Sequence, residues 1–472
     1  MAARERLAPV GAVFGAAALA ALWPLTAYAV SPLALPSILA LAVATTVILR
    51  RPEYGLALVL ALSPVVNASL PGASSGTVSA PAQPFEFLVP VLTMGVLLYS
   101  LLLLRTPSHS GSNQRMLGIC VAAFAASALL SSSRALEPSA SVAKVMLILT
   151  AALLFFAVRQ VAQERRQLIV VVAGALAGLL VASVQGIVSH LLGIDSTLGF
   201  VSGSEVIGRI QGSFGHPNIY GGYLALLMPV AFAVAFSPHF PRQLRWLAAI
   251  AGATAIPALV FSYARGAVIG LLIATVLILS ITRPRLALAM VVGFALAAFA
   301  LAPAALKDRF DPASSGGDVT LRSDIWNASL EIYSSQPALG VGVSNFQTAY
   351  SNLPTTASGT SQRRLLHDTQ LLVPPHAQNI YLQALAEQGL VGLLSLAALL
   401  ISAVVITIRA IRTSDGMTRT LGLGVGIGVI GLMLHGLLEI PLYSEAILPM
   451  FALLGVVAIF LDRESPALAG PA

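Results

Sequence analysis

Charged side chains are scarce in this sequence. Asp, Glu, Lys and Arg make up 10% of its 472 residues, whereas a soluble globular protein carries about 25%. Hydrophobic residues make up 57%, and the mean hydropathy is +0.88. This balance excludes an ordinary soluble domain. We expect a polytopic membrane protein in which residues 1–472 form a single integral domain.

Cysteine and basic clusters are also lacking. The single Cys120 excludes an intrachain disulfide and gives no thiolate metal site. The net charge is +7, but the arginines are spread over short loops, so we expect no nucleic-acid partner. The polar loops hold no clustered Asp-x-Asp and no set of His and Glu ligands, which argues against a metal. No cofactor is expected either.

Long apolar runs fill most of the chain, and about 20 such residues suffice to cross a membrane as a helix. They are too long and too unalternating for barrel strands, so the fold class is all-α, a bundle of 12 to 14 transmembrane helices. The first run is read as a helix rather than a cleaved signal peptide because a second run follows at once. The candidate spans are 8–29, 33–49, 54–67, 85–104, 116–131, 140–158, 168–192, 219–236, 246–262, 265–282, 286–304, 380–408, 418–438 and 445–461.

The distribution of Lys and Arg predicts the orientation. Cytoplasmic loops carry an excess of these residues. If the N-terminus is cytoplasmic, most of the 26 Lys and Arg residues fall on the cytoplasmic side, with a pair in almost every loop. Both termini are then cytoplasmic. Two polar segments face outward, a long and partly helical loop over 305–378 and a second loop over 193–218.

The basic residues on the predicted outward side, Arg134 among them, run against this orientation rule, and three of the arginines form a candidate group. Arg209 lies in the second loop, Arg265 at a hinge between two spans, and Arg322 in an amphipathic stretch of the long loop. Arginine stays charged at any relevant pH and matches phosphate geometry, so together they could form an anion site. As alternatives, Arg265 could be a helix-end residue that reaches the interface, and Arg209 could cap a loop.

The other polar candidates also have two interpretations. His376 ends the long loop and is either an ordinary loop histidine or a base. His435 and Glu439, four residues apart near the outer end of a span, are either a packing pair or part of a site. Lys144 is either an interface anchor or a site residue.

Five blocks of the sequence resemble the O-antigen ligase and polymerase superfamily in both order and spacing. They cover roughly residues 200–460, and the first seven spans carry no such motif. The blocks are Gly208-Arg209 to Asn218, Ser262-Tyr263-Ala264-Arg265-Gly266, Leu321-Arg322 to Trp326, Gln336 to Phe346, and His376 to Gly389.

The resemblance implies a metal-independent glycosyltransferase of the bacterial inner membrane with a periplasmic active site. Its donor would be a glycan linked to undecaprenyl diphosphate, and the bilayer would hold the lipid tail. Arg209 and Arg265 fall on the arginines that grip the diphosphate, and Arg322 is assigned to the same anion site. His376 falls on the catalytic histidine, with Arg265 beside it. The family often reads His-x-His-Asn, whereas here Gln378 occupies the third place. Supporting roles are assigned to His216, Asn218, Gln378, Asn379 and Glu439.

Three classes of function remain open. The first is a ligase that transfers a finished glycan to an acceptor sugar such as lipid A-core. The second is an O-antigen or exopolysaccharide polymerase of the same superfamily, and a protein O-oligosaccharyltransferase is a variant of this chemistry. The third is a transporter, against which stand the lack of a visible inverted repeat and the concentration of polar residues in one outer loop.

Overall fold

The structure is a computed structural model that describes most of the chain. It describes residues 51–65, 111–193, 196–202, 205–286, 288–289, 312–353 and 374–464, with side chains of the long-loop helix from Arg322 onward. The expected spans 8–29, 33–49 and 85–104 lie outside the described residues, as does nearly all of 286–304.

Within the described residues, eight helices are long and apolar enough to cross a membrane. This confirms a multi-pass helical protein, while the total of 12 to 14 spans stays a prediction. The eight are α5 (Ser112–Ser132), α6 (Pro138–Val161), α7 (Arg165–Leu191), α8 (Pro217–Phe236), α9 (Arg242–Ser262), α10 (Arg265–Thr282), α16 (Ile380–Thr413) and α17 (Gly416–His435).

Two further helices and two 3-10 turns belong to the described part of the bundle. The run expected at 54–67 forms only the short helix α3 (Pro52–Leu62), which η1 (Ser63–Val65) follows. A second 3-10 turn, η2 (Pro441–Tyr443), precedes α18 (Ile447–Glu464). Side chains are buried all round α18 from Ile447 to Asp462, so this helix forms part of the core rather than a lipid-facing wall.

Small residues let α17 approach its neighbours closely. A Cβ at Gly428 would lie 2.1 Å from the Leu226 carbonyl oxygen of α8, and one at Gly424 would lie 2.7 Å from the Val230 Cα. On another face, Gly431 lies against Gly270 of α10. Close backbone approach gives tight van der Waals packing where the hydrophobic effect cannot drive association. It brings the start of α8 and of α10 together with the end of α17.

Helix α16 is broken near its start. Gly389 has φ 64° and ψ −162°, a conformation that glycine adopts without strain. The backbone groups near the break bond to the segment before α14: Val341 N–H donates to the Ala386 carbonyl, and Gly342 N–H to that of Glu387. In the other direction, Leu390 N–H donates to the Pro337 carbonyl. The break is therefore satisfied by protein rather than left open to lipid.

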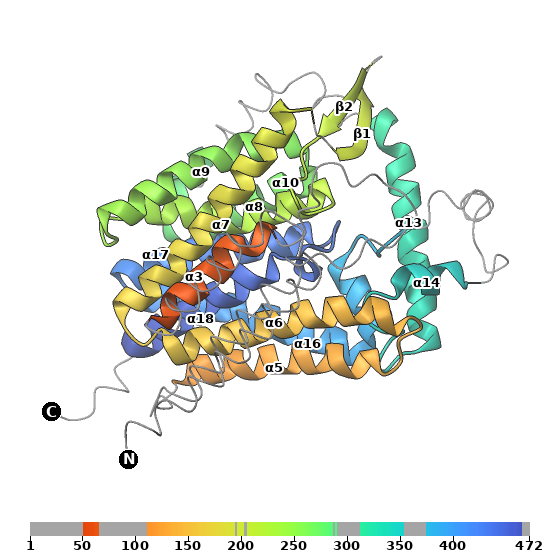
Figure 1. The fold of residues 1–472 in the computed structure, drawn as a ribbon, viewed down its shortest axis with the longest axis horizontal. Coiled ribbons are helices and arrows are strands. Elements are labelled where there is room, and N and C mark those ends of the chain that lie inside the picture. Colours follow the sequence, from red (N-terminus) through yellow and green to blue (C-terminus); the bar gives the residue numbers. More distant parts are fainter. Residues whose placement is uncertain are drawn as a thin grey trace, which may run out of the picture.

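The two segments that were expected to face outward contain structure of their own. Helix α13 (Pro312–Ser335) stands across the ends of the bundle helices, next to the short α14 (Phe346–Ser351), as Figure 1 shows. Ile325, Ala328 and Ile332 of α13 pack in one apolar cluster with Phe346 and Ala386. The long segment is thus partly helical, as expected. Residues 354–373 lie outside the described part.

The second segment forms an antiparallel hairpin, which the all-α prediction did not include. Strand β1 (Ser196–Ser202) pairs with β2 (Glu205–Arg209), with Ser202 opposite Glu205 and Ser196 opposite Arg209. A bulge lies between Ser196 and Phe200. The hairpin ends at Arg209, which fixes where this side chain enters the bundle.

Asp462, at the other end of the molecule, joins α18 to the start of α5. The N-cap of α5 is Gly111, which has no side chain to accept the first N–H groups. Asp462 supplies the missing acceptors, Oδ1 to Asn113 N–H at 3.1 Å and Oδ2 to Gln114 N–H at 3.0 Å. Because Asp462 is 3% exposed, water cannot replace it.

We therefore predict that Asp462→Ala destabilises the fold by about 1–3 kcal/mol, the usual cost of leaving buried donors without acceptors. Thermal unfolding of the detergent-solubilised protein measures this as a lower Tm. Asp415→Ala is the matched control, because the Asp415 side chain is fully exposed and its pair with the half-exposed Arg419 is long, at 3.9 Å. Equal Tm values for the two variants would contradict the capping role.

Candidate functional site

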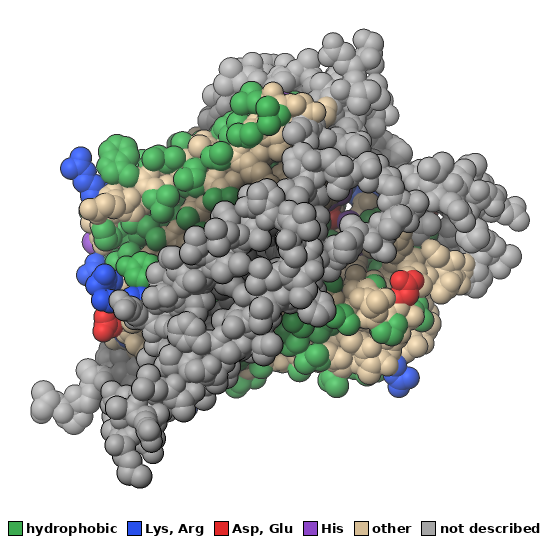
Figure 2. Space-filling view, in the orientation of Figure 1, with side chains coloured by type: hydrophobic (Ala, Val, Ile, Leu, Met, Phe, Trp, Pro, Cys, Tyr) green, Lys and Arg blue, Asp and Glu red, His purple; other side chains and the backbone are tan. Residues whose placement is uncertain are grey.

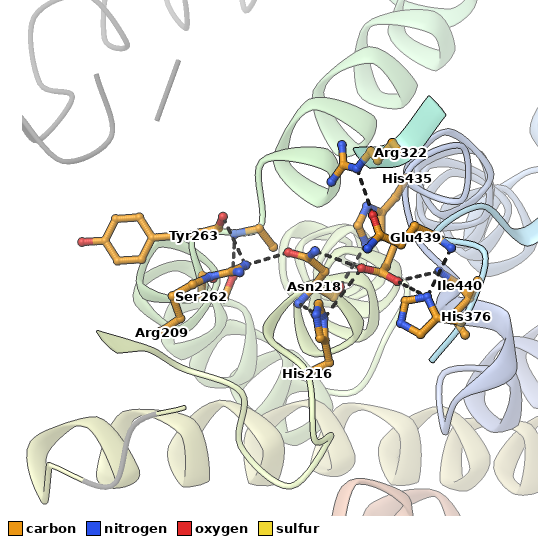
Figure 3. A network of polar contacts seen from close by, with 12 residues as sticks. Arg209, His216, Asn218, Ser262, Tyr263, Arg322, His376, His435, Glu439 and Ile440 are labelled. Carbon is orange, nitrogen blue, oxygen red and sulfur yellow. Dashed lines mark hydrogen bonds and ion pairs between the residues drawn. The ribbon is translucent and has the colours of Figure 1, made fainter. Parts of the chain in front are cut away.

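The buried carboxylate of Glu439 is the centre of a polar cluster where α8 and α16 begin and α17 ends. Glu439 is 1% exposed and lies between the end of α17 and η2. Its Oε1 accepts the Ile440 N–H at 3.1 Å, and its Oε2 accepts the Asn218 Nδ2 at 2.9 Å. His376 Nδ1 lies 3.5 Å from Oε1, and His216 Nδ1 lies 3.7 Å from Oε2 (Figure 3). A buried carboxylate is thus bonded on both oxygens and faces two imidazoles.

Asn218, in the first turn of α8, links Glu439 to Arg209. Its Oδ1 accepts from Arg209 Nη2 at 2.6 Å, while its Nδ2 donates to Glu439. A guanidinium can only donate and a carboxylate can only accept, so this pair of contacts fixes the amide orientation. Arg209 Nε also donates to the Ser262 carbonyl at 3.0 Å, and Nη2 reaches the Tyr263 carbonyl at 3.5 Å. The arginine therefore ties the hairpin to the turn between α9 and α10.

His435 contacts Asn218 from the other side. Its Nε2 lies 2.9 Å from the Asn218 backbone carbonyl, which can only accept, so Nε2 carries a proton. The ring is 2% exposed and fits where two glycines leave room. A Cβ at Gly266 would lie 2.7 Å from His435 Nδ1, and one at Gly222 would lie 3.1 Å from Cδ2. His435 of α17 thereby packs against both α8 and α10 and fixes how the three helices lie around the cluster.

The segment that carries His376 is fixed by its own backbone. Asn379 is the N-cap of α16, and its Oδ1 accepts the N–H groups of Tyr381 and Leu382. Its Nδ2 donates to the Leu437 carbonyl, which attaches the cap to the end of α17. Gln378 has φ 50°, and its N–H donates to His376 Nδ1 at 3.2 Å. This left-handed residue turns the His376 ring back toward Glu439.

His216 holds the corresponding place at the start of α8. It is the N-cap of that helix, and its Nδ1 accepts the Asn218 N–H at 3.2 Å. Its ring centroid lies 6.1 Å from that of His376, at an interplanar angle of 83°. The His216 side chain is 27% exposed and that of His376 only 11%. Two histidines therefore flank one carboxylate, one buried and the other partly open.

Arg322 contacts the segment that carries His376, and Arg265 lies at the turn between α9 and α10. Arg322 Nε donates to the Gln378 Oε1 at 3.1 Å, which joins α13 to the His376 segment. Arg265 is the first residue of α10 and is half-buried. It follows Tyr263, a left-handed residue with φ 50° whose carbonyl accepts both the Arg265 N–H and Arg209. The hinge expected between two spans is therefore present, and Arg209 and Arg265 both bond to its Tyr263 carbonyl.

The electrostatics of the cluster are set by burial and by mutual charge. Burial lowers the pKa of His376; the Glu439 carboxylate opposes this and the Lys144 ammonium adds to it, so the net shift is downward. Burial likewise lowers the pKa of His216, again against the pull of Glu439. For Glu439, burial would raise the pKa, but His376, His216 and the Asn218 amide outweigh it and hold the pKa below its ordinary value. Near neutral pH, Glu439 is thus ionised and the histidines can accept protons.

The sequence-predicted residues other than Arg265, which lies at the hinge, fall into one network, with differing closeness to its centre. His216, Asn218 and His376 contact Glu439, whereas Arg209, Gln378 and Arg322 are linked to it through other residues. Asn379 caps α16 and bonds to backbone groups rather than to Glu439. Lys144 Nζ donates to the Tyr443 carbonyl at 2.6 Å, which is an anchoring contact. In the described part of the chain, no group of three or more His, Cys, Asp or Glu is placed to hold a metal ion.

Sequence reasoning left His435 undecided, and it did not anticipate the carbonyl groups of Ser262 and Tyr263. The spacing of four residues between His435 and Glu439 was the available signal. It could not show that the two side chains contact opposite sides of Asn218, because Glu439 follows the end of the helix rather than continuing it.

Part of this chain is similar to a known protein family. Residues 247–397 match the family model described as O-antigen ligase. The match includes most of α9, all of α10, α13 and α14, the His376 segment and the first half of α16. It leaves Arg209, His216, Asn218, His435 and Glu439 outside. The chain matches no curated protein sequence. This match, in a chain whose described part has eight helices long and apolar enough to cross a membrane, supports membership of the O-antigen ligase superfamily.

Proposed function

We propose that this protein is an O-antigen ligase-type glycosyltransferase. It moves a glycan from undecaprenyl diphosphate to an acceptor sugar of lipid A-core at the periplasmic face of the bacterial inner membrane. The observation that carries the proposal is the His376–Glu439 pair, at 3.5 Å, in a chain whose residues 247–397 match the O-antigen ligase family. The family suggests a glycosyltransferase-type enzyme, and the pair supplies a base suited to that chemistry.

His376 is assigned as the general base. The acceptor hydroxyl must lose its proton as it attacks the sugar carbon, and a base with a pKa near the working pH does this best. To act as base through Nε2, the neutral His376 ring carries its proton on Nδ1, toward the Glu439 carboxylate and in place of the contact with the Gln378 N–H. Nε2 then has a free lone pair for the hydroxyl proton. The carboxylate then stabilises the imidazolium that forms, which is the role a buried Asp plays beside a catalytic histidine.

The arginines are assigned to the donor diphosphate. Negative charge grows on the leaving group as the bond to the sugar breaks, and fixed cationic donors can stabilise it without a metal ion. Arg265 begins α10 at the hinge, and Arg322 lies on α13 above the His376 segment. Arg209 contributes its charge while it also positions Asn218 through the contact at 2.6 Å.

The position of the cluster supports a membrane-boundary reaction on the periplasmic side. The cluster lies where α8 and α16 begin and α17 ends, beneath α13, so a lipid tail could lie along the apolar helices while its head group reaches the histidines. Lys and Arg side chains gather at the opposite end, on the left of Figure 2, with apolar side chains between. By the positive-inside rule, that opposite end is cytoplasmic.

A polymerase would use the same cluster with a different acceptor, so a glycolipid gel of the cell envelope separates the two. In a host that lacks this gene, a ligase defect leaves core without O-antigen and long glycans on the carrier lipid. A polymerase defect instead leaves core that bears a single repeat unit. We predict the ligase pattern, and we predict that wild type restores the product while His376→Ala does not. Full complementation by His376→Ala, with equal membrane insertion, would remove His376 from the mechanism.

Arg265→Ala is predicted to lower the transfer rate by about 100-fold or more, as removal of one donor to a developing negative charge does elsewhere. Arg265→Lys should recover only part of the rate, because an ammonium cannot bind phosphate as a planar fork. Arg134→Ala, at an exposed arginine on the same predicted side, is the control and should transfer normally. Initial rates from purified protein with extracted donor and acceptor measure this, and normal transfer by Arg265→Ala would contradict the assignment.

Glu439→Gln is predicted to lower kcat by about 100-fold or more, since general base catalysis contributes about 10²–10⁴-fold. Glu439 raises the pKa of His376, so its loss lowers that pKa further. The acidic limb of the pH–rate profile, where the base becomes protonated, therefore moves to lower pH. Glu387→Gln is the matched control, because Glu387 is equally buried but accepts the Phe346 N–H instead. An acidic limb that stays in place in Glu439→Gln would contradict the pairing.

A further inference from the structure

His216 occupies a position that mirrors the one held by the proposed base. Each of the two histidines places Nδ1 near one oxygen of Glu439, His376 at 3.5 Å from Oε1 and His216 at 3.7 Å from Oε2. Each Nδ1 also accepts the N–H of the residue two places later in the chain. Figure 3 shows both rings beside the Glu439 carboxylate. Each Nδ1 therefore has two possible partners. When Nδ1 carries a proton toward Glu439 in place of the N–H contact, Nε2 is the nitrogen left for a substrate.

We propose that His216 is a second catalytic histidine, which donates a proton to the departing diphosphate while His376 takes one from the acceptor hydroxyl, with Glu439 as their shared counter-ion. This rests on the proposed function and adds a role that the match over residues 247–397 does not reach. The proposal assigns acid and base to the two sides of one carboxylate.

One carboxylate compensates one positive charge. In a buried cluster, two imidazoliums beside a single Glu439 would leave a net charge that burial makes costly. A cluster with one imidazolium is neutral, and it stays neutral if one histidine gains a proton as the other loses it. Two titratable groups in different environments are the usual basis for an acid and a base in one site. The titration then belongs to the trio rather than to one residue.

Exposure and charge decide which histidine carries the proton before reaction. The His216 side chain is 27% exposed and that of His376 is 11%, so burial opposes the imidazolium less at His216. The groups that act on His216 are Glu439, which favours its protonation, and Arg209, His376 and His435, which disfavour it together with burial. A bound diphosphate is an anion and acts in the same direction as Glu439. Donor binding is therefore expected to bring a proton to His216.

The reaction step balances in atoms and charge. The acceptor oxygen forms a bond to the anomeric carbon as the bond from that carbon to the phosphate oxygen breaks. The hydroxyl proton moves to His376 Nε2, and the Nε2 proton of His216 moves to a phosphate oxygen of the lipid diphosphate. Afterwards His376 is the imidazolium and His216 is neutral, and exchange with water restores the starting state.

His216→Asn tests the proposal with little change to the fold. Asparagine is among the preferred N-cap residues and keeps an acceptor for the Asn218 N–H, but it cannot donate a titratable proton. If this variant does not fold, His216→Ser keeps the cap in the same way. His239→Asn is the control, since His239 lies in the connection between α8 and α9, at the end opposite the cluster.

The first measurement is kcat against pH, with undecaprenyl-diphosphate-linked glycan and lipid A-core extracted from a host that lacks the gene. Wild type and His239→Asn are expected to give a bell-shaped profile. His216→Asn should lose the alkaline limb and about 100-fold of kcat, with the donor KM changed far less. A His216→Asn profile that keeps its alkaline limb, or an unchanged kcat, would overturn the proposal.

The second measurement does not need transfer. Nitrogen NMR of histidine-labelled protein in lipid nanodiscs reports ring protonation, and the His216 signal is identified by its loss in His216→Asn. Undecaprenyl diphosphate at pH 7 should convert His216 to the imidazolium, whereas neutral undecaprenol should not. If the lipid diphosphate shifts other signals but leaves His216 neutral, the acid role is wrong. If wild type neither transfers glycan nor responds to the lipid diphosphate, the proposed function itself fails.

Discussion

A charge buried among membrane helices must be compensated, and in this protein that charge is the Glu439 carboxylate. At 1% exposure it can be ionised only because hydrogen-bond donors meet both oxygens. The elements that supply these donors converge from distant parts of the chain. Asn218 comes from α8, Ile440 from the residues after α17, and the two histidines from the segments that begin α8 and α16. The requirement to satisfy one carboxylate therefore determines how these helix ends meet.

Two left-handed backbone residues near the cluster also help to position the groups around Glu439. Tyr263 and Gln378 hold left-handed conformations that a side-chain-bearing residue seldom adopts. Such strain persists where the surrounding structure fixes the backbone, and it concentrates at functional sites. Here Tyr263 turns the chain so that its carbonyl meets Arg209, and Gln378 turns it so that its N–H meets His376. Both turns lie directly before a helix, which makes their geometry rigid.

Much of the architecture could be predicted from the sequence, because lipid requires long apolar helices. Eight of the expected spans are present within the described residues, and the hinge at Arg265 lies where the motif placed it. Hydropathy could not separate α18, whose burial on all sides depends on neighbours, from a lipid-facing span. Nor could it find the break at Gly389, since the apolar run continues through it. The β1–β2 hairpin was missed because its polar segment carries no strong alternation.

The sequence identified the candidate residues, but it did not predict which of them contact one another. Arg209 was expected to face a substrate anion, and the structure shows it also bonded to Ser262 and Asn218. That contact depends on the register of β2 against α9, which no local pattern encodes. The sequence could not show that His216 and His376 hold mirrored places, because 157 intervening residues separate His-Pro-Asn from His-Ala-Gln-Asn. Only the fold brings the two segments to one carboxylate.

Asn218 has a further consequence as a neutral spacer between opposite charges. A direct bridge from Arg209 to Glu439 would neutralise the carboxylate and leave little field for the histidines. The amide accepts from the arginine and donates to the carboxylate, so it transmits position while it keeps the two charges apart. Asn218 thus holds Arg209 and Glu439 in fixed positions without letting their charges meet. The cluster is therefore rigid, and the Glu439 charge still acts on the two histidines. A direct ion pair between Arg209 and Glu439 would not combine these two properties.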